Sequence, residues 1–126
     1  MKLGAFIAAH ATASPDKVAV RGGAESITFR QLDDAGDRLA DALAKLGLVH
    51  GDRVALFVPS SVEFVVCFAA AVKAGFIGVP VSNRLTAAEV AVILDDCRPR
   101  AIVLNKDTRD TFRAAASSRR ARACRC

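Results

Sequence analysis

The chain has 126 residues, enough for one domain with a hydrophobic core. Its net charge of +5 is typical of nucleic-acid-binding proteins, but four of the arginines lie in the last ten residues, which contain no acid. The rest of the chain holds 14 basic and 13 acidic residues, so we expect no nucleic-acid-binding domain.

The most apolar segment is bracketed by Glu63 and Lys73, so it is much shorter than the roughly 20 residues that span a membrane. The N-terminus starts with Met1-Lys2-Leu3, but it lacks the long apolar region and the cleavage site of a signal peptide. We therefore expect a cytoplasmic protein without a transmembrane segment.

The first half of the chain is predicted to form a helix, a hairpin and a second helix. A short amphipathic helix precedes Ser14-Pro15, and strands at 17–21 and 26–28 flank the Gly22-Gly23 turn. Thr28 then begins a helix with Gln31 as its capping-box partner, and Gly47 ends it. The apolar residues recur at helical spacing: Leu32, Ala35, Leu39, Ala42, Leu43 and Leu46. Opposite charges four residues apart predict the ion pairs Asp34–Arg38 and Asp41–Lys45.

The stretch from residue 51 to residue 81 has the pattern of a strand, a helix and a second strand. The uninterrupted apolar run 54–58 suits a strand covered on both faces, as in a parallel sheet. Ser60 is predicted to cap the following helix with Glu63, and Gly75 to end it in the left-handed conformation. Because residues 64–72 carry no charge, we expect this helix to be buried nearly all round. A βαβ unit of this kind has a right-handed crossover.

The last third continues the alternation. Thr86, with Glu89, is predicted to cap a helix that ends before Pro99, and 101–104 is a third apolar strand, followed by a helix at 107–116. The fold class is therefore α/β: a partial parallel sheet of βαβ units with flanking helices and an N-terminal hairpin. Residues 1–116 form this domain, and 117–126, which are only Ser, Arg, Ala and Cys, are predicted to be a disordered Arg/Cys tail.

No residues form a convincing catalytic or metal-binding pattern. Neighbouring helical carboxylates such as Asp33-Asp34 and Asp95-Asp96 point about 100° apart and make no acid–base pair. Cys67 and Cys97 read as small buried residues. Cys124 and Cys126 lack the further ligands of a zinc site, since the only histidines elsewhere are isolated: His10 and His50. We predict no catalytic residue and no metal site in this chain.

The linear order of short motifs is more specific than any single motif. The motifs are Ser14-Pro15-Asp16-Lys17-Val18-Ala19-Val20, Ile27-Thr28-Phe29-Arg30-Gln31-Leu32, Leu39-Ala40-Asp41-Ala42-Leu43, Leu46-Gly47-Leu48, Gly51-Asp52-Arg53-Val54-Ala55, Val58-Pro59-Ser60-Ser61-Val62-Glu63, Lys73-Ala74-Gly75, Val79-Pro80-Val81 and Arg84-Leu85-Thr86-Ala87-Ala88-Glu89. Together, over residues 3–113, they resemble the N-terminal segment of the adenylate-forming, AMP-binding superfamily, in particular the acyl-CoA synthetases (fatty acid–CoA ligases).

This resemblance implies a reaction that the chain does not complete by itself. Members of the family use ATP and Mg to convert a carboxylic acid to an acyl-adenylate, and coenzyme A then displaces AMP to give a thioester. Their phosphate-binding loop is rich in Ser, Thr and Gly and ends in Pro-Lys-Gly, and this sequence contains no Pro-Lys pair. We expect the N-terminal part of a larger AMP-binding domain, inactive alone and with no cofactor of its own.

The resemblance implies one ligand-binding residue. In some CoA ligases of this family, the arginine that begins the Arg-Leu-Thr pattern lies near the CoA nucleotide, and Arg84 holds that position. Ser82-Asn83 stands where the family often has Asn-Pro, which weakens the match. The alternative is that Arg84 is a solvated loop residue or a helix-cap partner.

Two other functions remain open from the sequence. The chain could be a stand-alone α/β interaction module that pairs with a full-length synthetase through an uncovered part of its sheet. The arginine tail could bind RNA, although no aromatic or glycine residue accompanies its arginines as in single-strand binders. We favour the interpretation that the tail is non-functional sequence, such as a reading-frame slip or a truncated gene end.

Overall fold

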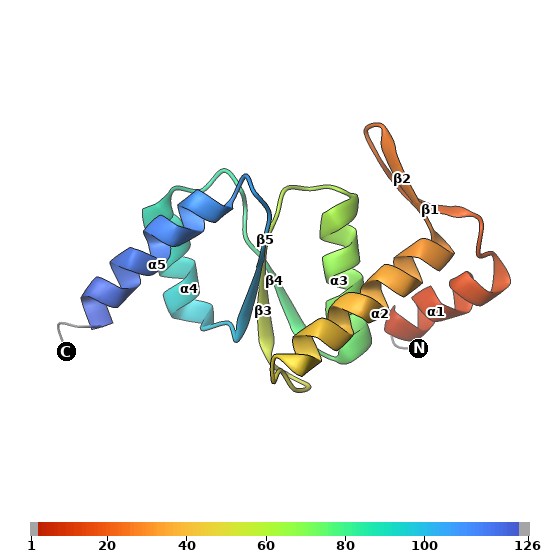
Figure 1. The fold of residues 1–126 in the computed structure, drawn as a ribbon, viewed down its shortest axis with the longest axis horizontal. Coiled ribbons are helices and arrows are strands. Elements are labelled where there is room, and N and C mark those ends of the chain that lie inside the picture. The colour runs from red at the N-terminus through yellow and green to blue at the C-terminus, as the bar shows by residue number, and fades with distance from the viewer. Residues whose placement is uncertain (1–2, 124–126) are drawn as a thin grey trace.

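The computed structural model describes the backbone of residues 3–123 and the side chains of residues 4–117. Its elements follow the predicted order (Figure 1). They are α1 (Leu3–Ala13), β1 (Val18–Gly22), β2 (Glu25–Thr28), α2 (Phe29–Lys45), β3 (Arg53–Phe57), α3 (Val62–Ala74), β4 (Ile77–Pro80), α4 (Ala87–Cys97), β5 (Ala101–Leu104) and α5 (Arg109–Ala123). None of the helices described is long and apolar enough to cross a membrane.

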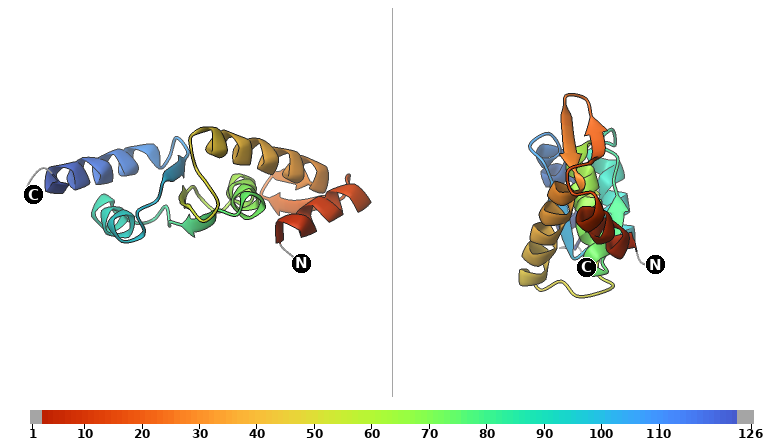
Figure 2. Two further views of the ribbon diagram at one scale, coloured as in Figure 1. Left: turned by 90° about the horizontal axis from the view of Figure 1, so that it is seen from below. Right: turned by 90° about the vertical axis from the view of Figure 1, so that its right-hand side faces the viewer.

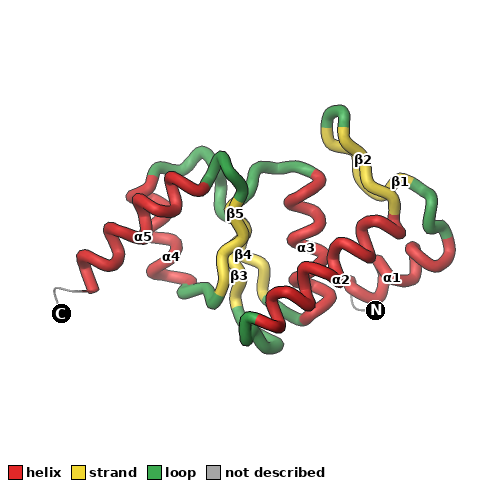
Figure 3. Tube along the Cα trace, viewed as in Figure 1, coloured by secondary structure: helices red, strands yellow, loops and turns green. Residues whose placement is uncertain are grey.

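The strands form two separate sheets, and together with the helices they confirm the predicted fold class. β1 and β2 pair antiparallel as an N-terminal hairpin, and β4, β3 and β5 form a parallel sheet in that order. In this sheet Ala55 lies opposite Val79 on one side and opposite Ile102 on the other. The colouring by secondary structure in Figure 3 shows the hairpin standing apart from the three parallel strands.

The central strand β3 is covered on both faces, as its uninterrupted apolar run predicts. Val54 and Leu56 pack with residues of α2 and α3, whereas Ala55 and Phe57 pack with residues of α4 and α5. All four side chains are at most 1% exposed. Figure 2 shows the corresponding layers, with α2 and α3 on one side of the strands and α4 and α5 on the other.

Most helix ends follow the predicted capping chemistry. The capping boxes of Thr28 with Gln31 and of Thr86 with Glu89 both form, and Gly75 ends α3 at φ 76°. The predicted cap at Ser60 is wrong by one residue. Ser61 caps α3 instead, because its backbone is extended and its hydroxyl, which donates to the Pro59 carbonyl, also accepts a hydrogen bond from the N–H of Phe64 at 3.3 Å.

Small residues let α1, α2 and α3 approach one another closely. A Cβ at Gly4 would lie 2.9 Å from Lys73 Cα, and one at Gly36 would lie 3.4 Å from Ala69 Cβ. Where α2 meets α3, Lys73 forms ion pairs with Asp33 and, at 2.8 Å, with Asp37. The predicted pairs Asp34–Arg38 and Asp41–Lys45 are not among the ion pairs of the described residues. Asp33 and Asp37 of α2 therefore form ion pairs with α3.

The C-terminal helix is longer than predicted. We expected it to end at residue 116 and the rest to be disordered, but α5 continues to Ala123. Ala and Arg are among the strongest helix formers, so the helix can extend past Ala115, its last buried residue among those described. Cys124, Arg125 and Cys126 of the predicted tail lie outside the described residues.

Candidate functional site

The carboxyl ends of the three parallel strands gather the loops in which a binding site is expected. These loops are residues 58–61 after β3, 81–86 after β4 and 105–108 after β5. The connection from β3 to β4 passes through α3 on one face, and that from β4 to β5 passes through α4 on the other. From β3 the chain adds β4 on one side, and from β4 it crosses back over β3 and adds β5 on the other side. Ligands of open α/β sheets bind where the strand order changes direction in this way, here between β3 and β5.

A buried threonine joins the ends of β3 and β5 at this point. Thr108 is 2% exposed, and its hydroxyl donates to the carbonyl of Phe57 at 2.6 Å and accepts from the N–H of Asn105 at 3.2 Å. The side-chain oxygen of Asn105 in turn accepts from the N–H groups of Asp107 and Thr108, both at 3.0 Å. These bonds fix the loop after β5 against the end of β3.

Two adjoining hollows open beside this loop. The first has a volume of about 430 Å³ and is mostly apolar, lined by Val58, Val62, Glu63, Val66, Cys67, Val103, Leu104 and Asn105. The second, of about 500 Å³, is polar and is lined by Glu25, Pro59, Ser61, Glu63, Asn105, Lys106 and Asp107. Three carboxylates surround one ammonium in the second hollow, a charge balance that repels a triphosphate.

Cys67 lines the apolar hollow, and burial lowers the reactivity of its thiol. Burial raises the pKa of its thiol to about 11, and the carboxylate of Glu63 adds to this effect. Because the thiolate is the nucleophilic form, a thiol held protonated in this way is unreactive at neutral pH. The structure thus agrees with the expectation that Cys67 is a small buried residue, whereas Cys97 is half-buried.

The pKa of Lys73 is also shifted. This residue lies between α2 and α3 and not at the carboxyl ends of the strands. Burial alone would lower the pKa of its ammonium, but hydrogen bonds and charges from Asp33 and Asp37 outweigh burial and raise it. All its described polar partners are on α2. Lys73 is therefore held as a structural cation.

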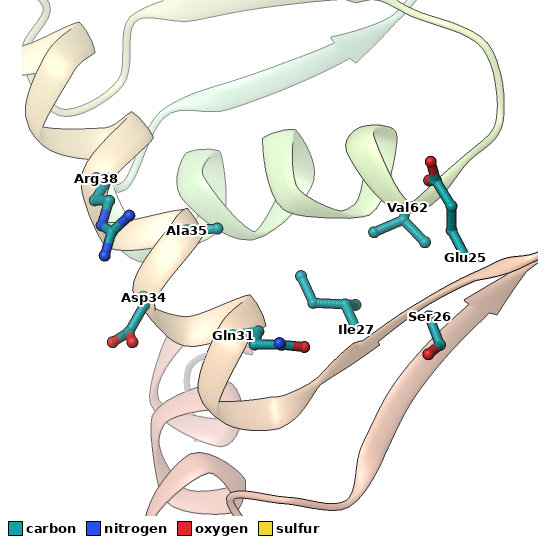
Figure 4. Close-up of a pocket in the computed structure, with 8 residues that line it drawn as sticks. All are labelled: Glu25, Ser26, Ile27, Gln31, Asp34, Ala35, Arg38 and Val62. Carbon is teal, nitrogen blue, oxygen red and sulfur yellow. The ribbon is translucent and has the colours of Figure 1, made fainter.

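A further hollow lies between the hairpin, α2 and the start of α3, and it shares Glu25 and Val62 with the two hollows beside β5. Its volume is about 480 Å³, and Figure 4 shows its lining, which is Glu25, Ser26, Ile27, Gln31, Asp34, Ala35, Arg38 and Val62. Gln31 is already engaged, because its side-chain oxygen accepts from the N–H of Thr28 at 2.9 Å. The lining mixes acidic, basic and apolar side chains without a common chemistry, so we assign no ligand to it.

Arg84, the one residue predicted to contact a ligand, is exposed on the loop after β4. Its backbone N–H donates to the hydroxyl of Ser82 at 3.2 Å, which shapes the turn. Its guanidinium takes part in none of the described ion pairs and lines neither hollow beside β5. The loop therefore presents an exposed cation at the carboxyl end of β4.

The sequence interpretation missed Asn105 and Thr108. Both follow the apolar strand 101–104, and an Asn three residues before a Thr is a pattern in which side chains bond nearby backbone groups. That pattern could have indicated a fixed loop, but the bond to Phe57 depends on the fold. Among the described residues, no cluster of three or more His, Cys, Asp and Glu could hold a metal ion.

Comparison with known proteins identifies the family. A family model described as AMP-binding enzyme matches residues 7–125. The chain belongs to the AMP-binding enzyme family. The long-chain-fatty-acid–CoA ligase FadD13 of Mycobacterium tuberculosis (strain ATCC 25618 / H37Rv) is 43% identical over 77 residues, which are 61% of this chain and 15% of that protein. The 4-hydroxybenzoate–CoA/benzoate–CoA ligase of Rhodopseudomonas palustris is 31% identical over 101 residues, 80% of this chain and 19% of that protein.

A solved structure confirms the architecture of this AMP-binding segment. The inhibitor-bound N-terminal domain of FACL13 from Mycobacterium tuberculosis superimposes with a TM-score of 0.84 at 36% identity, covering 90% of this chain and 29% of that one. The chain spans less than a fifth of the length of the two curated relatives. The fold is therefore that of the first part of a longer AMP-binding domain.

Proposed function

We propose that this chain forms the N-terminal part of an acyl-CoA synthetase and is inactive without the rest of the domain. Supporting this are the family match over residues 7–125 and relatives named as CoA ligases. The complete enzyme would use ATP and Mg to activate a carboxylic acid and would then transfer the acyl group to coenzyme A. The named acids of the relatives range from long-chain fatty acids to benzoates, so we propose only the class carboxylic acid.

Within this enzyme, the part of the chain described by the structure contributes a scaffold and not a phosphate cradle. The hollow beside β5 has an acidic rim, and the described residues offer no metal cluster. The acidic rim of this hollow does not suit the negative charge of ATP, so we propose that segments outside the described residues supply its phosphate-binding groups. The observation that carries the proposal is the family match over residues 7–125, and the joining of β3 to β5 through Thr108 fixes the strand ends on which those segments would be placed.

We propose that Arg84 contacts the nucleotide phosphate of coenzyme A. Its guanidinium is exposed, without a described ion-pair partner, and lies on a loop that Ser82 shapes. A guanidinium binds a phosphate through two parallel hydrogen bonds, which suits this role. The role that we propose for Arg84 is binding alone.

The test is a chimera in which residues 1–116 are joined, at the equivalent position, to the remainder of FadD13. We expect the chimera to release pyrophosphate in a manner that depends on carboxylic acid and ATP, and the 126-residue chain alone to release no more than a heat-treated control. Acid-dependent release by the isolated chain, or none by a folded chimera, would contradict the proposal.

The role of Arg84 is tested in the same chimera. The Arg84→Ala variant should raise KM for coenzyme A by about tenfold to a hundredfold, because one charge-assisted hydrogen bond contributes about 1.5–3 kcal/mol, while KM for ATP stays unchanged. Arg100→Ala, which removes an exposed arginine at the opposite end of the strands, is the matched control. Equal effects of the two substitutions would assign Arg84 to the solvated loop instead.

A further inference from the structure

The positive charge of the chain is concentrated in α5 and the residues after it. Residues 111–126 contain five arginines and no acidic residue. Subtracting these five from the 18 basic residues of the chain leaves 13 basic and 13 acidic residues in 1–110. The net charge of +5 therefore resides entirely in the last 16 residues, and electrostatic binding of a polyanion is expected from this part of the chain alone.

The backbone presents these arginines on a helix that extends out of the domain. α5 packs on the sheet through Phe112 and Ala115 and then continues to Ala123, about two turns past Ala115, its last buried residue among those described. Figure 1 shows this end of α5 as the outermost part of the molecule, on the side opposite α1. A helix anchored in the domain gives its charges a defined spacing, which the predicted disordered tail would lack.

The helical spacing brings three arginine positions to one side of α5. Arg109, Arg113 and Arg120 lie within about 40° of one another around the helix axis and span about 16 Å along it, a length over which duplex DNA carries about ten charges. Arg109 and Arg113 are exposed and take part in none of the described ion pairs. The neighbouring helix α4 ends with the exposed acids Asp95 and Asp96, which repel phosphates, so we expect the contact on the side of α5 turned away from α4.

The composition of the arginine tail (residues 117–126) favours a nucleic-acid duplex over a single strand or a bilayer. Single-strand binders stack bases on aromatic side chains, and membrane-bound helices bury an apolar face. The tail offers neither, because it consists only of Ser, Arg, Ala and Cys. A duplex hides the faces of its bases and presents its phosphates on the outside, so arginines alone are sufficient to bind it.

We propose that the C-terminal end of α5 binds the phosphate backbone of double-stranded nucleic acid through its arginines. The binding is electrostatic and independent of base sequence, because contacts to phosphates carry no direct information about the bases. It is an interaction separate from the proposed function and does not rest on it. The chimera described above contains only residues 1–116, so it lacks the arginine tail.

Fluorescence anisotropy of the 126-residue chain with a labelled DNA duplex of about two helical turns tests this directly. We expect a Kd of about 10⁻⁶ M at 50 mM salt, equal for two duplexes of unrelated sequence. Neutralising about four phosphates gives a slope of log K against log salt of about −3.6, which weakens binding about a hundredfold at 200 mM salt. No binding at 50 mM salt, or a Kd that is independent of salt, would overturn the proposal.

Removing charge from the tail should weaken this binding strongly. The combined variant changes three arginines to glutamine, which is also a good helix former: Arg119→Gln, Arg120→Gln and Arg122→Gln. It should bind at least about tenfold more weakly, with a slope that is smaller by about 2.7. Because all three positions follow the last described buried residue, the rest of the fold should be unchanged, as circular dichroism and urea denaturation would show.

A matched control removes the same charge from exposed residues of the hairpin and α2, at the other end of the molecule (Figure 1). Its substitutions are Arg21→Gln, Arg38→Gln and Lys45→Gln. Binding should change less than about twofold, because these residues lie far from the proposed contact. Equal losses in the two combined variants would assign the binding to net charge and overturn the proposal.

The role of the helix is tested at Ser118, between the packed part of α5 and the arginines. Ser118→Pro interrupts the helix and should weaken duplex binding several-fold, whereas Ser118→Ala, which preserves the helix, should not. Equal Kd values for the two variants would show that the arginines bind as a flexible tail, which contradicts presentation by α5.

Two competing ligands and the chimera complete the design. A single strand of the same length, or vesicles that contain phosphatidylserine, should bind more weakly than the duplex, and tighter binding of either would overturn the choice of partner. Duplex binding by the 126-residue chain together with an inactive chimera would contradict the proposed function alone. An active chimera together with no duplex binding by the 126-residue chain would contradict this inference alone.

Discussion

The two faces of the parallel sheet are covered in different ways. On one face α3 is backed by α2 and α1, and glycines and alanines let these helices approach closely. Ion pairs from Lys73 to two aspartates join α2 to α3. On the other face, α4 and α5 form a single layer, and α5 extends beyond Ala115, the last of its described residues to be buried.

The face covered by α1, α2 and α3 should be stable by itself (the self-sufficient face), whereas the face covered by α4 and α5 should need further contacts for its stability (the dependent face). On the three-helix face Ile7, Leu32 and Ala69 are buried between the helices, although Phe6 of α1 and Phe68 of α3 are 45% and 38% exposed. Because three helices pack together here, this face should keep its structure in isolation. The α4 and α5 face leaves Val92 62% exposed and the edge of β5 open. We infer that stability is concentrated around β3 and α3, and that α4, β5 and α5 open at lower free energy.

Core truncations on the two faces should give the largest effects. Leu56, on the α3 face, and Leu94, on the α4 face, are each 1% exposed. Leu56→Ala should lower the free energy of unfolding by about 4 kcal/mol and Leu94→Ala by about 3 kcal/mol, since the thinner layer can relax around a cavity. Urea denaturation followed by circular dichroism measures both. A larger loss for Leu94→Ala would reverse the comparison.

Removing the cation between α2 and α3 should have the next largest effect. The side chain of Lys73 is 11% exposed, so Lys73→Met leaves Asp33 partly buried without its partner and should cost about 2 kcal/mol. Asp37 is 57% exposed, so solvent screens its share of the interaction. Lys45→Met, which changes an exposed lysine of α2, is the control and should cost almost nothing.

The raised pKa of Lys73 gives this prediction a pH dependence. A pKa that is higher in the folded state means that folding favours the charged form. Its contribution is complete below the ordinary pKa of 10.5 and is lost as pH rises through the higher folded value. The wild type should therefore lose stability above about pH 10.5 and the Lys73→Met variant should lose less, as thermal unfolding at several pH values would show.

Much of this organisation could be predicted from sequence, and the exceptions share one physical cause. The caps at Thr28 and Thr86 follow from residues three positions apart, and the burial of β3 on both faces follows from its unbroken apolar run. By contrast, the bond from Thr108 to Phe57 and the partners of Lys73 depend on residues 51 and 40 positions away. Local patterns carry no information about such contacts. The aspartates of α2 were therefore expected to pair within their own helix.

The buried thiol should give a smaller, pH-dependent effect. The pKa of Cys67 is raised from 9.0 to about 11, so the unfolded chain ionises first as pH rises and stability is lost between these values. In a background with serine at positions 124 and 126, Cys67 should react with a thiol reagent at pH 8 more slowly than the half-buried Cys97. Equal rates would show that the apolar hollow admits solvent.

Removing a helix cap should give the smallest effect. Thr28→Ala and Thr86→Ala should each destabilise the chain by about 1 kcal/mol, because each removes the acceptor for one N–H of the first helical turn. The comparison predicts that Thr28→Ala lowers global stability, whereas Thr86→Ala increases only the local opening of α4. Circular dichroism together with limited proteolysis would distinguish the two.

Native-state hydrogen exchange of the isolated chain tests the asymmetry between the two faces most directly. We predict that the amides of α3 and those of β3 that bond to β4 exchange only through global unfolding. The amides of α4 and α5 should exchange through a partial opening whose free energy is lower by about 1–3 kcal/mol and depends less on denaturant. A single opening free energy throughout β3, α3, α4 and α5 would contradict the division into a self-sufficient and a dependent face.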